Sequence, residues 1–114
     1  MAEVVSMIRT DVTTPIENVT ERIKRDIGAE LITDTRVELG EGKKAIFLGF
    51  EEYYFRVSNY VTLSIMLTDD QNVQTATIMG AGGGSGIFNF SWGANRSFAR
   101  NGEEVLSSLG FRRK

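Results

Sequence analysis

The chain has 114 residues, of which 41% are hydrophobic and 25% are charged, and its formal net charge is −2. These values are typical of a globular protein with one core, so we expect residues 1–114 to form a single domain without disordered tracts. The sequence contains no cysteine and no histidine, which excludes disulfides, thiol chemistry, histidine-based catalytic triads and zinc sites, and the acidic balance argues against nucleic-acid binding.

The sequence also predicts a cytoplasmic protein. Glu3 stands where a secretory signal would carry positive charge, and no apolar run approaches the ~18 residues of a membrane span. We therefore expect neither export nor membrane insertion.

The first elements in chain order are a strand and a helix. Residues 3–9 alternate loosely between apolar and polar side chains and predict a strand. The helix is expected to begin with Thr14 as N-cap, Pro15 in the first helical position and Glu17 completing a capping box, and to end at Gly28. Its apolar face is formed by Ile16, Val19, Ile23 and Ile27.

A meander of antiparallel strands is predicted next, over residues 30–39, 43–56, 60–68 and 73–79. Gly40-Glu41-Gly42 predicts a turn that needs positive φ angles, and Asp69 to Asn72 predicts another. Gly49 or the pair Glu51-Glu52 is expected to mark a bulge within the second of these strands. The third strand alternates most regularly, with four side chains expected to face the helices, namely Val61, Leu63, Ile65 and Leu67.

The last elements are a strand over 87–92 and a helix that ends at Gly110. Asn95 is one expected N-cap for this helix. Because Gly102 weakens a helix interior by about 1 kcal/mol relative to alanine, a start near Asn101 is the alternative. Together the elements predict an α+β fold in the order β-α-β-β-β-β-(β)-α, a single antiparallel sheet of about five or six strands with two helices packed on one face.

The stretch 80–86, which holds five glycines in seven residues, is the first candidate site. Backbone amides freed of side chains can bind phosphate, but the lysine of a Walker loop and the third glycine of a Rossmann fingerprint are missing. A connection between two strands is therefore the favoured interpretation. The alternative is a small-ligand, nucleotide or anion site formed by Gly82, Gly83, Gly84, Ser85, Trp92, Asn95 and Arg96.

The aromatic and charged residues form the remaining candidates. The aromatic group consists of Tyr53, Tyr54, Phe55, Phe88, Phe90 and Trp92. Base stacking would need basic residues between these rings, whereas Glu51 and Glu52 lie beside the tyrosines, so core packing is favoured, and an exposed tyrosine would indicate a protein interface. Adjacent strand residues point to opposite faces, so Glu51 and Glu52 are not expected to form an acid–base pair unless a bulge intervenes. Another carboxylate could still meet one of them across strands, although a solvated strand face is favoured. A group of basic residues could bind an anion, although a solvated helix face is the commoner explanation. The group consists of Arg96, Arg100, Arg112, Arg113 and Lys114.

Three stretches carry a resemblance to a known family. These are Tyr-Tyr-Phe-Arg at 53–56 with the alternating strand through Leu67, the glycine-rich segment, and Phe-Asn-Phe-Ser-Trp-Gly-Ala at 88–94. The chain resembles a family of small bacterial proteins of unknown function, mainly from Gram-positive species. The resemblance implies a stand-alone cytoplasmic α+β protein and carries over no catalytic or binding residue.

Two functions follow as hypotheses. The first is a non-enzymatic binding or interaction module that self-associates, most simply as a two-fold dimer, because the strands carry apolar residues on both faces. The second is the small-ligand, nucleotide or anion site beside residues 80–86. The residue types favour a protein that is not an enzyme, and we expect no cofactor and no bound transition metal.

Overall fold

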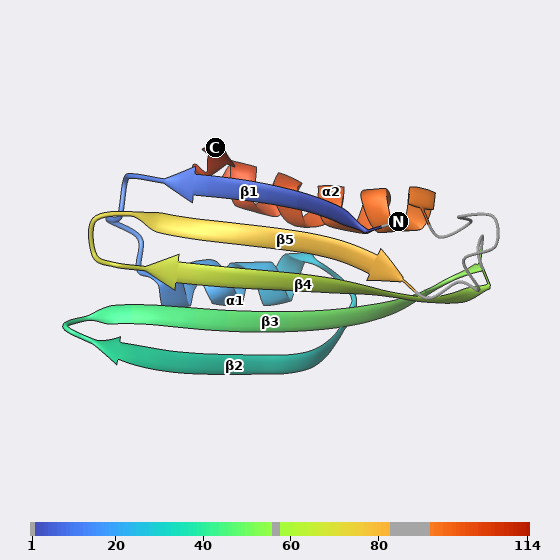
Figure 1. Ribbon diagram of the computed structural model, residues 1–114, viewed down its shortest axis with the longest axis horizontal. Helices are drawn as coiled ribbons and strands as arrows, with labels where there is room; N and C mark the ends of the chain where they lie inside the picture. Colours follow the sequence, from blue (N-terminus) through green and yellow to red (C-terminus); the bar gives the residue numbers. More distant parts are fainter. Residues whose placement is uncertain (1, 56–57, 83–91) are drawn as a thin grey trace.

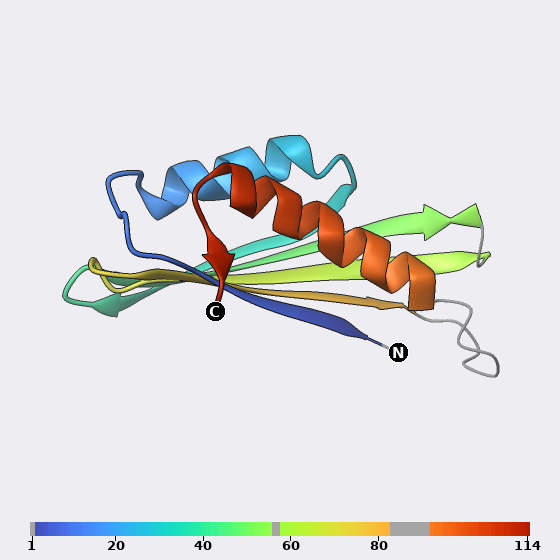
Figure 2. The ribbon, with the colours of Figure 1, turned by 90° about the horizontal axis from the view of Figure 1, so that it is seen from above.

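The computed structural model describes residues 2–55, 58–82 and 92–114. Within these residues the chain forms six strands and two helices, in the order β1 (Glu3–Arg9), α1 (Ile16–Asp26), β2 (Glu30–Gly40), β3 (Lys43–Tyr54), β4 (Asn59–Asp69), β5 (Gln74–Gly82), α2 (Trp92–Ser108) and β6 (Arg112–Arg113). The strands form one antiparallel sheet with the spatial order β2-β3-β4-β5-β1-β6 (Figure 1). Both helices lie on one face of this sheet (Figure 2). The predicted α+β fold is therefore confirmed.

The core lies between the helices and the sheet, and the strand alternation sets which side chains enter it. The four residues predicted to face inwards from β4 are fully buried, as is the apolar face of α1. Burial of one such side chain contributes roughly 1.5–3 kcal/mol, so this layer is the main source of stability. Neither helix of the described residues is long and apolar enough to cross a membrane.

The start of α1 differs from the predicted capping box. The N-cap residue is Pro15, with φ −58° and ψ 146°, and no side chain caps the helix. The Pro15 carbonyl accepts the N–H groups of Asn18 and Val19, at 3.0 and 3.3 Å. Glu17 instead forms an ion pair with Lys44 of β3, a partner that lies far away in the sequence. The end of the helix follows the prediction, since Gly28 has a φ of +72°.

The predicted bulge lies in β2 and not in β3. Leu31 pairs with Phe50 and Thr33 pairs with Gly49, so the intervening residue Ile32 is the extra one, whereas β3 pairs with β4 without interruption. Gly49 leaves the space into which the bulged strand fits, because a Cβ atom there would stand 3.2 Å from Thr33 Cγ2.

Part of the glycine-rich stretch is strand, because β5 continues through Gly80 to Gly82 and pairs with β4. A Cβ atom on Gly80 would stand 2.2 Å from the backbone oxygen of Asn95, so glycine is required where α2 crosses the sheet. The predicted strand over 87–92 falls mainly on residues outside the described part of the chain. Its last residue, Trp92, is the first residue of α2.

The last helix is longer than predicted. Asn95 lies within α2 and is buried, so it is not an N-cap, and the helix passes through Gly102 without a break. Gly102 is buried against β5, where a Cβ atom would stand 3.2 Å from Ile78 Cγ2. Close packing on the sheet thus offsets the helix cost of this glycine. The strand β6 was not predicted, and it pairs Arg112 and Arg113 with Ile8 and Met7 of β1.

A buried arginine of β1 bonds to the segment that precedes α1 and to the segment that follows α2. Arg9 is 5% exposed, and its guanidinium donates to the Leu109 carbonyl at 2.8 Å, to the Thr14 carbonyl at 3.0 Å and to the Gln74 side-chain oxygen. Its Cζ atom lies 4.9 Å from the centre of the Phe111 ring. Burial lowers the pKa of Arg9, while Asp11 and Asp69 act in the opposite direction.

Candidate functional site

The face of the sheet opposite the helices is the candidate site, and none of the described elements covers it (Figure 2). We call it the open face. The strand registers place on it seven large apolar or aromatic side chains that are 39–58% exposed, namely Val4, Val37, Phe47, Tyr53, Tyr60, Met66 and Met79. The bulged residue Ile32, which is 57% exposed, lines a hollow on the same face. Exposed apolar side chains that adjoin one another across several strands mark an interaction surface.

The middle of the open face carries hydroxyl groups in place of charges. Its polar positions on β4 and β5 include Thr62, Ser64, Thr68, Thr75 and Thr77. Several of these groups bond within the sheet: Thr62 Oγ1 donates to the Ala81 carbonyl at 2.8 Å, and the hydroxyls of Thr68 and Thr75 bond to each other. A hydroxyl that already has a partner loses little when water is removed, so these residues lower the cost of covering the face.

A hollow of about 230 Å³ lies on the open face around Gly49. It is lined by residues of β2, β3 and β4, among them Ile32, Thr33, Phe47, Glu51, Thr62 and Ser64. The missing side chain of Gly49 and the bulge at Ile32 create it. A hollow of this size can receive one or two side chains of a partner.

Three aromatic rings gather at one end of the open face. The rings of Tyr53 and Phe55 lie 5.1 Å apart at 82°, and those of Tyr53 and Tyr60 lie 5.2 Å apart at 72°, both edge-to-face. Tyr54 points to the other side of the sheet and contacts Phe98 of α2, with ring centres 5.9 Å apart. The tyrosines thus divide between the two faces, and Tyr53 and Tyr60 are the exposed ones.

The residues predicted for a ligand site beside 80–86 are described only in part. Gly83, Gly84 and Ser85 lie outside the described residues, and of Trp92 only the place in α2 is described. A Cβ atom on Gly82 would stand 3.0 Å from Asn95 Oδ1, so these two predicted residues do lie together. The ligand site stays a prediction.

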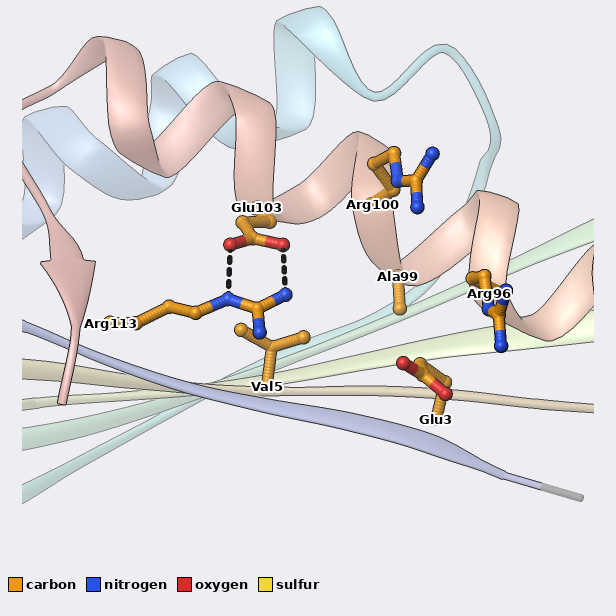
Figure 3. A pocket seen from close by; sticks show the side chains of 7 residues that line it. All are labelled: Glu3, Val5, Arg96, Ala99, Arg100, Glu103 and Arg113. Carbon is orange, nitrogen blue, oxygen red and sulfur yellow. Dashed lines mark hydrogen bonds and ion pairs between the residues drawn. The ribbon is translucent and has the colours of Figure 1, made fainter.

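Arg96 lies in a separate small cavity between α2, β1 and β6, which Figure 3 shows. Arg100 and Arg113 line it with Arg96, and so do the carboxylates of Glu3 and Glu103. Arg113 holds Glu103 with two bonds of 2.6 and 2.9 Å and keeps the pKa of Glu103 below its usual value. The cavity measures about 20 Å³, which is room for about one water molecule. Two carboxylates and so small a volume make it a poor anion site.

The acidic neighbours Glu51 and Glu52 lie on opposite faces of the sheet, and Glu51 lies opposite Glu30 of β2. Glu51 pairs with Thr62 on the open face and Glu52 pairs with Val61, which faces the helices, as the alternation predicts. Within the described part of the chain, no three acidic side chains gather as a metal ion would need.

Comparison with known proteins gives a family without an assigned activity. A family model described as a family of unknown function, DUF6054, matches residues 1–110. No curated protein matches the chain. Among solved structures, the chain is similar to the Mll3558 protein from Rhizobium loti, with 13% identity over 95% of each chain and a TM-score of 0.35, a likeness too distant to carry an argument.

Proposed function

The chain belongs to DUF6054, a family of unknown function, and we propose that it is a non-enzymatic interaction module that self-associates through its open face. One observation carries the proposal. Large apolar side chains that are 39–58% exposed lie on strands β1 to β5, on a face that no described element covers, and they include the directly paired Phe47 and Met66, Tyr53 and Tyr60, and Val4 and Met79. The sequence-based hypothesis of a self-associating protein agrees with this surface.

The size of the open face supports a stable contact. Five strands about 4.8 Å apart, with about nine residues each at 3.3 Å per residue, cover roughly 24 by 30 Å, or about 700 Å². A standard protein–protein interface buries about 800 Å² on each partner. One copy stacked on another would therefore bury an area of the usual size.

The edges of the sheet are less suited to association than its face. The outer strand β2 has register irregularities beside Leu31 and Glu38, and its Asp34 and Arg36 are bound to each other. On the other side, β6 has two residues, both arginines. Bulges, charges and short strands are the features by which proteins prevent edge-to-edge pairing. The middle of the open face carries apolar and hydroxyl side chains instead.

A second copy is the partner that the surface fits best. The centre of the open face is neutral, so two copies can stack without placing like charges against each other. A two-fold contact needs a surface that complements itself, and apolar side chains beside small hydroxyl residues provide one.

The test is the mass of the protein in solution, measured by light scattering after size exclusion from low to high micromolar concentration. We expect the wild type to have the mass of a dimer and Phe47→Glu to be a monomer, because a carboxylate would be buried at the centre of the contact. The matched control is Leu31→Glu, since Leu31 is 39% exposed, close to the 42% of Phe47, but pairs with Phe50 and so faces the helix side. A monomeric wild type at high micromolar concentration would refute the proposal.

A further inference from the structure

We infer that two copies stack with β3 of one lying antiparallel over β3 of the other, with Phe47 on the two-fold axis and Lys43 facing Glu51. The inference rests on the proposed self-association and specifies its geometry. It comes from the charge pattern of β3, the strand whose open-face positions are, in order, Lys43, Ala45, Phe47, Gly49, Glu51 and Tyr53.

Two of these six positions are charged, and their signs are opposite. Lys43 and Glu51 each lie four residues from Phe47, on either side of it. Consider a two-fold axis that lies in the plane between the two sheets and runs perpendicular to the strands. Rotation about this axis makes β3 of the second copy run antiparallel to β3 of the first. Lys43 of each copy then faces Glu51 of the other, and two ion pairs form. An axis parallel to the strands would instead place Lys43 on Lys43 and Glu51 on Glu51.

Distances permit these contacts. Four residues span about 13 Å along a strand. Packed sheets lie about 10 Å apart and are rotated by about 30°, so the charged positions are displaced sideways by roughly 7 Å. The flexible four-carbon stem of lysine can cover this offset.

The neighbouring acidic residue gives a second reason for a cation at this place. Glu30 pairs directly with Glu51, so two carboxylates lie side by side at one end of the open face. Like charges directly opposite each other destabilise a sheet. Lys43 of the second copy would bring positive charge to this pair.

The same axis matches apolar shapes on the neighbouring strands. Phe47 pairs with Met66, so both residues contact their own counterparts at the axis. Val37 pairs with Ala45, and Thr33 pairs with Gly49. Val37 and Ala45 of one copy therefore face the hollow around Gly49 of the other, where the exposed Val37 side chain can be buried.

The experiment uses charge reversal with full-length protein, and the dissociation constant of the dimer is measured by analytical ultracentrifugation. Lys43→Glu and Glu51→Lys should each weaken the dimer about ten-fold or more, because each replaces two attractive contacts by two repulsive ones. The double variant should regain the wild-type constant. A mixture of the two single variants should form heterodimers, since the two substituted side chains would then face each other with opposite charges, and so would the unchanged Lys43 and Glu51.

The outcomes separate this inference from the proposed function. If the wild type is a dimer and either single reversal leaves its constant unchanged, the stacking geometry is wrong and the interaction module stands. If the singles weaken the dimer but neither the double variant nor the mixture restores it, Lys43 and Glu51 are not partners and the geometry is also wrong. A monomeric wild type refutes both. Thermal unfolding of each variant verifies that it is folded, and substitutions at these surface positions should cost little.

Discussion

Replacing the buried arginine of β1 is the sharpest stability test that the structure offers. In Arg9→Met, the unbranched stem of the side chain is kept as far as the position of Arg9 Nε, but the guanidinium and every donor are lost. The Thr14 carbonyl still accepts the Gln74 amide at 3.0 Å. The Leu109 carbonyl and the Gln74 side-chain oxygen lose the donors that Arg9 supplies.

The expected cost follows from these two acceptors. A buried acceptor left without a partner costs about 1–3 kcal/mol, so two cost roughly 2–6 kcal/mol. The variant no longer buries a charge, which offsets part of this loss. We therefore expect the free energy of unfolding to fall by about 3 kcal/mol. At about 4 °C per kcal/mol for a domain of this size, the midpoint should fall by roughly 12 °C.

The assay is urea unfolding followed by circular dichroism, with calorimetry for the midpoint. The control is Arg22→Met, because Arg22 is exposed on α1 and pairs with Asp26 at 2.7 Å, an interaction worth less than about 0.5 kcal/mol. A loss below about 1 kcal/mol for Arg9→Met would mean that the buried cation contributes little beyond a methionine, and the reasoning would be refuted.

Two further predictions concern charge and packing. The side chains of Arg36 and Lys24 lower the pKa of Asp34 to about 2 in the folded protein, whereas the pKa in the unfolded chain is near 4. The ionised carboxylate therefore stabilises the fold fully at a pH above about 4, and this stability is lost as the pH falls through about 2. Asp34→Asn should therefore lower the free energy of unfolding by about 1 kcal/mol at pH 7, after allowance for solvent screening. The difference from the wild type should disappear in acid, and a difference that does not change with pH would contradict this prediction. Gly80→Ala should lower the free energy of unfolding by about 2–3 kcal/mol, because the new Cβ atom would stand 2.2 Å from the backbone oxygen of Asn95. The control is Gly49→Ala, which should have a smaller effect because its Cβ atom would stand 3.2 Å from the Thr33 methyl group. Equal unfolding midpoints for the two variants would show that α2 can move away from β5.

Local patterns predicted the elements well, and the errors lie where distant residues decide. The alternation of β4 identified its buried side, and Gly28 identified the end of α1. The capping box is absent because Pro15 is the N-cap and Glu17 pairs with Lys44 of β3. The Thr14 carbonyl likewise bonds Arg9 and Gln74, and the local sequence shows none of these partners. These partners become known once the sheet order is known.

The glycines and the open face show the same limit. Glycine can signal a turn, a bulge or a close approach, and the sequence could not tell that Gly80 and Gly102 serve the contact between α2 and β5. Alternation reveals which residues share a face of a strand. It does not reveal that both helices pack on the same face of the sheet and leave Phe47 and Met66 exposed on the other face.

The place of β1 in the sheet has a consequence for how the chain folds. Strands β2 to β5 pair with their sequence neighbours, but β1 pairs with β5, Glu3 opposite Gly80, and with β6, Met7 opposite Arg113. During synthesis, β1 leaves the ribosome well before β5 and β6 and must wait for both of these partners. Closing so long a loop is slow, so the meander should form early and the docking of β1 should limit the folding rate.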